Sequence, residues 1–176
     1  VHPLGRGLDL APADLALSVS ELNIASRLGR ENILKKALAK VTGYDLALLD
    51  CGPSLSLLVV NALTAANAVI CPTLPTGLDL RGLRLFLTSL EEIKAELNPG
   101  LVMLGAVVCQ FENRKLHRAA LEDLQAGGVK VLATIGRSVK AAESGGEGSP
   151  ITSGVLAEQY RTLAEEINTW LKNANH

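Results

Sequence analysis

The feature that most constrains the fold is an apolar run that begins at Tyr44 and ends at Asp50, followed at once by the turn residues Gly52 and Pro53. Apolar runs of this length, bounded by turn residues, are typical of a parallel strand that is covered on both faces. Open α/β sheets bind their ligands at the carboxyl ends of such strands. The run therefore predicts a strand over 44–50 and makes Asp50 a candidate for a metal–phosphate site. The alternative is that Asp50 only caps the helix expected to follow.

Segments with strand and helix periodicity alternate along the rest of the chain. This alternation predicts βαβ units and hence an α/β fold with a doubly wound, mainly parallel sheet and helices on both faces. We expect a single, incomplete α/β domain over 1–176, with a mobile loop at the Gly- and Ser-rich segment 144–150. Strands are expected over 7–12, 68–72, 101–109 and 129–135, and helices over 18–29, 31–41, 55–66, 79–97, 116–126 and 155–171.

Composition excludes several classes of function. Seventeen basic and eighteen acidic residues leave a net charge of -1, so any binding to nucleic acid or membrane must depend on a local patch. The three cysteines, Cys51, Cys71 and Cys109, are widely spaced among apolar residues, which argues against a disulfide framework or a zinc site. We expect buried thiols in a reducing compartment. Since no apolar run approaches the ~18 residues needed to cross a bilayer, a cytoplasmic protein is expected.

Several short motifs occur in a fixed order and spacing: GLDLAPA (7–13), SRLGRE (26–31), YDLALLDCGPSL (44–55), NALTAA (61–66), LNP (97–99) and IGRSV (135–139). Together they resemble the ParA/Soj family of partition ATPases, the deviant-Walker group that also includes the MinD proteins. In that family YDLALLDCGPSL corresponds to the Walker B strand and switch II. The resemblance covers nearly the whole chain and implies a P-loop NTPase-like fold.

The resemblance also implies a biochemistry. The family hydrolyses ATP with Mg²⁺, forms dimers, binds DNA without sequence preference and works with a ParB-like centromere-binding protein in chromosome or plasmid partition. A homo-oligomer, associated with the nucleoid, is therefore expected. Asp50 would orient Mg²⁺ through water, and Gly52, Pro53 and Ser54 would sense the γ-phosphate. Gly52 stands where the family usually has proline, so this switch is expected to be looser.

Polar residues follow two further predicted strands. In the family, Gln110 and Phe111 after one strand, and Gly136 and Arg137 after the next, would border the adenine. Gly136 again replaces a family proline. The alternative is that these four are ordinary loop residues over the edge of the sheet.

The densest basic stretch contains Arg114, Lys115 and Arg118, and we expect Arg137 and Lys140 to lie on the same rim. Such a cluster predicts contacts to the phosphates of DNA. The alternative is the solvated start of a helix.

The 176 residues contain no Gly-x-x-x-x-Gly-Lys-Ser/Thr motif, which supplies the phosphate-binding loop in P-loop ATPases. We therefore expect this chain alone neither to bind ATP tightly nor to hydrolyse it, and to hold no cofactor by itself. Two interpretations stay open: a fragment of a partition ATPase, or a degenerate, non-catalytic interaction or regulatory module. A MinD-like positioning ATPase is a third. Membrane targeting is not expected, because the segment 163–172 at the end of the last expected helix has mixed, mainly acidic charges rather than basic ones.

Overall fold

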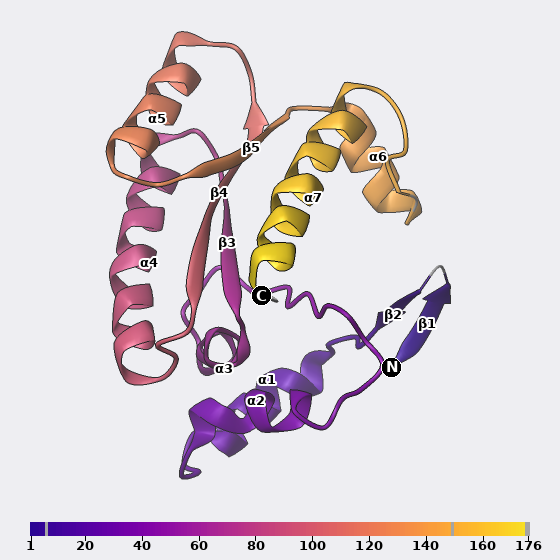
Figure 1. Cartoon of the computed structure of the whole chain (residues 1–176), viewed down its shortest axis with the longest axis vertical. Helices are drawn as coiled ribbons and strands as arrows, with labels where there is room; N and C mark the ends of the chain where they lie inside the picture. The colour runs from indigo at the N-terminus through magenta and orange to yellow at the C-terminus, as the bar shows by residue number, and fades with distance from the viewer. Residues whose placement is uncertain (6, 149, 175–176) are drawn as a thin grey trace. The chain divides into compact units, whose positions relative to one another are not determined.

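The computed structural model describes residues 1–5, 7–148 and 150–174 (Figure 1). The described chain folds as two compact units. The first contains Val1–Ala66 and Ile93–Pro99, and the second contains Asn67–Glu92 and Gly100–His176.

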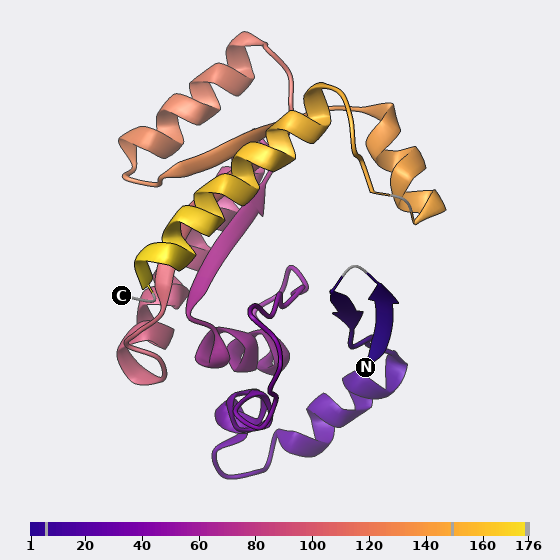
Figure 2. The same ribbon diagram turned by 45° about the vertical axis from the view of Figure 1, so that its right-hand side comes forward.

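A parallel sheet forms the centre of the second unit. Its strands are β3 (Ala68–Thr73), β4 (Val102–Phe111) and β5 (Val131–Gly136), in the order β3-β4-β5. Helices α4 and α5 lie on one side of the strands and α7 on the other (Figure 1), and Figure 2 shows α7 running along the sheet. The predicted parallel α/β arrangement with helices on both faces is confirmed for this unit. The helices are α4 (Gly77–Glu96), α5 (Lys115–Ala126), α6 (Val139–Glu147) and α7 (Val155–Ala174).

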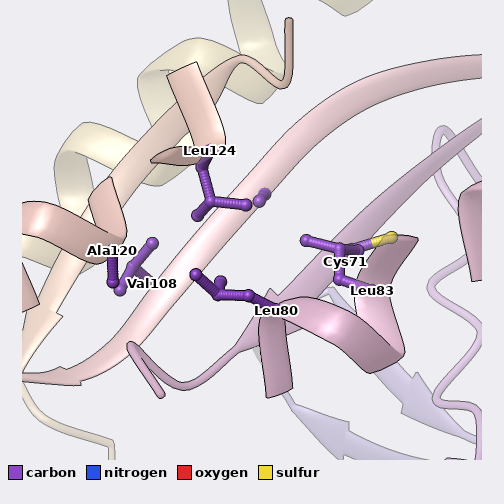
Figure 3. Close-up of a cluster of buried hydrophobic side chains, with 7 residues drawn as sticks. Cys71, Leu80, Leu83, Val108, Ala120 and Leu124 are labelled. Carbon is purple, nitrogen blue, oxygen red and sulfur yellow. The ribbon is translucent and has the colours of Figure 1, made fainter. Parts of the chain in front are cut away.

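Each face of this sheet has its own hydrophobic core. On the α4 and α5 side, Cys71, Leu83, Val108 and Leu124 belong to one buried cluster (Figure 3). On the other face, a second cluster includes Leu156 of α7. The apolar runs predicted as strands are thus covered on both sides, as parallel strands usually are.

Strand β4 contains two β-bulges that change which face its side chains cover. Met103 pairs with Val69, whereas Gly105 pairs with Ile70, so β4 carries one extra residue there. In the ladder with β5, a second extra residue of β4 follows Val108, and a shift between Ala106 and Val107 places an extra residue, Leu132, in β5. Each extra residue reverses the alternation of a strand. The α4 and α5 face accordingly receives Met103, Ala106, Val108 and Phe111, and the α7 face receives Leu104, Val107 and Cys109.

The first of these bulges requires glycine. Gly105 has a φ of +153°, and a Cβ built there would lie 2.5 Å from the carbonyl oxygen of Lys130. No side chain fits at that distance, so β4 and the segment leading into β5 approach each other more closely here than any other residue permits.

The first unit starts with an antiparallel hairpin of β1 (His2–Gly5) and β2 (Leu8–Leu10), which includes part of the strand predicted over 7–12. Helix α1 (Leu15–Ile24) begins earlier than predicted, because the carboxylate of Asp14 accepts a hydrogen bond from Ala16 N–H (2.9 Å) and caps the helix. The expected helix over 31–41 is the 3₁₀ turn η1 (Arg30–Asn32) followed by α2 (Ile33–Leu38).

One buried side chain holds much of this unit together. Asn61 lies on α3 (Leu57–Ala65) and is only 4% exposed. Its Oδ1 accepts from Leu34 N–H (3.1 Å), and its Nδ2 donates to Arg30 O (2.8 Å) and Leu57 O (2.9 Å). The NALTAA motif thus begins with a residue that ties α3 to η1 and α2.

Two predicted elements are wrong. Residues 44–56, all of which the structure describes, form neither strand nor helix, and Leu48 is 79% exposed. A strand is stable only when a neighbouring strand pairs with its N–H and C=O groups, and no described residue pairs with this run. The loop predicted over 144–150 is instead partly helical, since α6 extends to Glu147 and ends at the left-handed Gly148 (φ 65°).

Candidate nucleotide and polyanion site

The carboxyl ends of β4 and β5 bring together four residues that the sequence singles out. Phe111 pairs with Gly136 in the ladder, and Arg137 N–H donates to Phe111 O (3.3 Å). Gln110 has a φ of +52°, a left-handed conformation that is uncommon for a residue with a side chain. Strained backbone of this kind gathers at functional sites. The predicted adenine-bordering residues are therefore neighbours at the edge where parallel sheets bind ligands.

A pocket of about 240 Å³ opens beside these strand ends. Gly136 and Arg137 form one wall, and the start of α7, from Gly154 to Leu156, forms another. Gln159 also lines the pocket, and its Oε1 accepts a hydrogen bond from Gly136 N–H (2.9 Å). Its carboxamide NH₂ group keeps two donors for a ligand. The pocket thus combines apolar side chains, Ile151, Val155 and Leu156, with a few polar ones, Arg137, Ser138, Ser153 and Gln159, as ligand sites usually do.

Gln159 was missed from the sequence. A signal was present, because Leu156, Gln159 and Leu163 follow one another at i, i+3 and i+7 and so share one face of α7. Both leucines pack into the core beside the sheet. A polar side chain in that row faces the sheet, where it needs a polar partner, and Gly136 N–H is that partner.

A larger groove, of about 320 Å³, lies at the other end of β4 and β5, next to Gly105, Gly128 and Lys130. We give it less weight than the smaller pocket, because ligands of open α/β sheets bind at the carboxyl ends of the strands.

The predicted basic rim surrounds one acidic residue. Glu112 forms ion pairs with both Arg114 and Arg137 (3.4 Å for the latter), while Arg118 Nη1 donates to Asn113 Oδ1 (2.8 Å). Three of the five predicted DNA-contacting cations thus lie close together, because their partners Glu112 and Asn113 are adjacent. All three arginines are exposed. Lys115, at the start of α5, is exposed as well. Lys140 lies in α6, but its side chain is outside the described residues.

Next to this rim, the His117 ring links α5 to the end of β4. Its Nδ1 accepts from Glu112 N–H (3.0 Å), and its ring lies 5.9 Å from that of Phe111. The acceptor role fixes Nδ1 as the unprotonated nitrogen in this arrangement. His117 is thus a support for the turn at Glu112.

Asp50, Gly52, Pro53 and Ser54 form a separate group in the first unit, and all four are exposed. Among the residues that the structure describes, no three His, Cys, Asp or Glu side chains are placed to hold a metal ion. A single carboxylate fits the way Mg²⁺ usually binds, through one or two carboxylates with waters and substrate phosphates. Asp50 is thus chemically suited to such an ion, although the strand expected to position it is not formed.

The neighbourhood of this segment corrects one expectation. Cys51 is exposed rather than buried, whereas Cys71 is buried and Cys109 is half-buried, as predicted. Burial raises the pKa of the Cys71 thiol to about 11. Partial burial, and then the charge of Asp50, raise the pKa of Cys51 as well.

Tyr44, at the start of the same segment, donates a hydrogen bond from its hydroxyl to Asp9 Oδ2 (2.6 Å). This hydrogen bond raises the pKa of Tyr44, because ionisation would remove the donated proton and place two negative charges together. The pair connects the YDLALLDCGPSL motif to the hairpin of β1 and β2.

Within the described part of the chain, no helix is both long enough and apolar enough to cross a membrane.

Comparison with known proteins shows the family of the chain. The model of the AAA domain family matches residues 4–103. The chromosome-partitioning ATPase Soj of Thermus thermophilus is 39% identical over 181 residues, which cover 99% of this chain and 71% of Soj. An uncharacterised protein of Mycobacterium tuberculosis is 34% identical over 95% of this chain, which spans 55% of that relative.

Among solved structures, cobyrinic acid a,c-diamide synthase from Mycobacterium smegmatis superposes with a TM-score of 0.76 and 34% identity, over 90% of this chain and 62% of that one. A second structure of that enzyme, with bound ADP and magnesium, matches with a TM-score of 0.68 and 37% identity, over 72% of this chain and 54% of that one. The chain spans between about half and about seven-tenths of the length of these relatives. Since the family model covers more than half of the chain and Soj matches almost all of it, the chain belongs to the ParA/Soj/MinD family of AAA-domain proteins.

Proposed function

We propose that the chain works in chromosome or plasmid partition as a ParA-like ATPase. The observation that carries the proposal is the 39% identity to a chromosome-partitioning ATPase along 99% of the chain. The pocket at the carboxyl ends of β4 and β5 supports it, because a nucleotide-dependent protein of this fold needs a site there.

In this proposal the adenine lies in the 240 Å³ pocket, beside Gly136 and Arg137. Phe111 pairs with Gly136 in the ladder but packs on the α4 and α5 face, and neither Gln110 nor Phe111 lines the pocket. The NH₂ group of Gln159 donates to a ring nitrogen of the base. A base has acceptor nitrogens and flat apolar faces, which match an amide donor beside the apolar side chains of Val155 and Leu156.

A separate part of the proposal concerns the first unit alone. Asp50 would hold a Mg²⁺ ion through water, and Gly52, Pro53 and Ser54 would contact a γ-phosphate. When bound, Mg²⁺–ATP would supply the phosphoryl group that is hydrolysed. No phosphate-binding loop motif is among the 176 residues, so we propose that these residues alone do not hydrolyse ATP.

The proposed nucleotide site is tested by titrating the chain with Mg²⁺–ADP and recording amide NMR spectra, which detect weak binding. We expect the amide signals of Gly136, Arg137 and Leu156 to move, and a Gln159→Ala variant to lose most of that response. Gln125→Ala is the matched control, because Gln125 is exposed on α5 and does not line the pocket. Unchanged signals at the pocket, or a response equal in Gln159→Ala and Gln125→Ala, would overturn the adenine assignment.

Hydrolysis is tested separately by Mg²⁺-dependent phosphate release. The chain should release no more phosphate than its Asp50→Ala variant. Activity that disappears with Asp50→Ala would show that the 176 residues suffice for catalysis and would refute the proposed inactivity.

We further propose that the rim of Arg114, Lys115, Arg118 and Lys140, with Arg137, contacts the phosphates of duplex DNA. A homo-oligomer bound to the nucleoid, with a ParB-like protein as partner, completes the proposal. A MinD-like membrane role has less support. The apolar face of α7 carries Leu156 and Leu163 into the core beside the sheet, so that face is not available to a membrane.

A further inference from the structure

The basic rim contains an acidic residue whose position is built from several sides. Glu112 directly follows β4, and its side chain is only 24% exposed. Its backbone N–H donates to His117 Nδ1 (3.0 Å), which fixes the turn. One carboxylate oxygen pairs with Arg114 Nη2 and the other with Arg137 Nη1 (3.4 Å). A single carboxylate thus lies between two guanidinium groups from different segments.

The two arginines are otherwise open to solvent, since their side chains are 69% and 70% exposed. A phosphate group offers a guanidinium the same kind of paired oxygens that a carboxylate offers. Glu112 and a DNA phosphate are therefore alternative partners for Arg114 and Arg137. Arg118 is not held in this way, because its hydrogen bond goes to the neutral amide oxygen of Asn113 (2.8 Å).

We infer that Glu112 sets the affinity of the rim for duplex DNA by occupying Arg114 and Arg137 as an internal counter-ion. This inference rests on the proposed DNA binding at the rim. The rim then has two classes of cation. Lys115 and Arg118 attract DNA at all times, whereas Arg114 and Arg137 add their full charge only when a phosphate displaces Glu112.

Removing the charge of Glu112 should release both arginines for DNA. Exposed ion pairs are weak, so their loss should tighten binding by about two- to thirty-fold at low salt. Each additional phosphate contact steepens the fall of log K with log salt by about 0.9. The slope should therefore become steeper by about one to two, a change that a purely structural role of Glu112 would not produce.

The experiment measures the anisotropy of a labelled duplex of random sequence, titrated with the full 176-residue chain at a series of salt concentrations. Glu112→Gln is the main variant. Glu122→Gln is its charge-matched control, because Glu122 is exposed on α5, about 12 Å along the helix from the N-cap residue Arg114, and forms neither ion pair. Glu112→Asp keeps the charge on a shorter side chain that cannot span both arginines, so it should bind with intermediate affinity. It also serves if Glu112→Gln does not fold.

Arg114→Ala separates the two levels of the proposal. If Arg114→Ala weakens binding and Glu112→Gln tightens it more than Glu122→Gln does, both stand. When Arg114→Ala weakens binding but Glu112→Gln behaves like Glu122→Gln, the counter-ion role is overturned and DNA binding at the rim stands. Equal binding by the chain and Arg114→Ala, or no binding by any variant, would overturn DNA binding at the rim and the role of Glu112 with it.

Discussion

Exchanging glycine for alanine at two positions of the second unit should change stability in opposite directions. At Gly105 the added Cβ would lie 2.5 Å from Lys130 O and 2.9 Å from Leu132 Cγ. At Gly82, on the exposed side of α4, it would meet nothing within 4 Å. The same chemical change is thus predicted to destabilise one variant and to stabilise the other.

The magnitudes follow from these surroundings. Overfilling a packed site costs about 1–3 kcal/mol. A side chain at the φ of Gly105 adds backbone strain of about 1–3 kcal/mol. Gly105→Ala should therefore lower the free energy of unfolding by about 2–6 kcal/mol. Gly82→Ala should raise it by about 0.5–1 kcal/mol, because alanine restricts the unfolded chain and favours the helix.

Urea unfolding followed by circular dichroism measures both effects. With slopes of about 1–3 kcal/mol per molar urea, Gly105→Ala should move the midpoint down by at least about 0.7 M, and Gly82→Ala should move it slightly up. If Gly105→Ala unfolds at the midpoint of the unmodified chain while Gly82→Ala behaves as expected, β4 and β5 do not approach each other as closely as described.

Three further predictions concern the first unit and the cysteines. Asn61→Ala should lower the free energy of unfolding by about 2–4 kcal/mol, since it removes tertiary hydrogen bonds and leaves a backbone N–H without its partner. Urea unfolding measures this loss, and a change below about 0.5 kcal/mol would contradict the prediction. With Ellman's reagent at about pH 8, Cys51 should react in the folded chain. Cys71 is buried and has a pKa of about 11, so it should react only after unfolding. Equal reaction rates in single-cysteine variants would refute this prediction. The protonated hydroxyl of Tyr44 donates to Asp9, so the stability from this pair should be present below about pH 10 and be lost as the pH rises through the raised pKa. Asp9→Ala should lower the pH at which Tyr44 ionises. Ultraviolet absorbance measures this pH in a chain whose second tyrosine is replaced by phenylalanine. An unchanged titration would show that the hydrogen bond is not formed.

Elements whose pattern is complete within the segment could be predicted from sequence. The helix expected over 155–171 is α7, and the strand expected over 68–72 is β3, because the helical period of the first and the short apolar run of the second lie within the segment itself. The strand expected over 44–50 did not form because strand pairing depends on a second segment. An apolar run specifies a strand only when its partner is present.

The candidate site likewise contains residues that a local motif predicts and residues that depend on a distant segment. Gly136 and Arg137 were found because they belong to a short motif at a strand end. Gln159 was missed because its partner, Gly136, is 23 residues away, and only the packing of α7 brings the two together. The sequence did not single out Glu112, since its pairing with Arg137 across 25 residues cannot be read from spacing.

The two bulges of β4 also bear on how this strand can change in evolution. Each bulge reverses the faces of the side chains that follow it, and the second restores the phase that the first changed. Straightening the first bulge with no change in length would therefore send Val108 toward α7 and Val107 toward α4, exchanging residues between the two cores. Deletion of Leu104 together with loss of that bulge would leave both valines on their present faces. A lineage is thus expected to lose a bulge only when it also loses the extra residue, so homologous strands of equal length should keep both bulges even where their sequences have diverged.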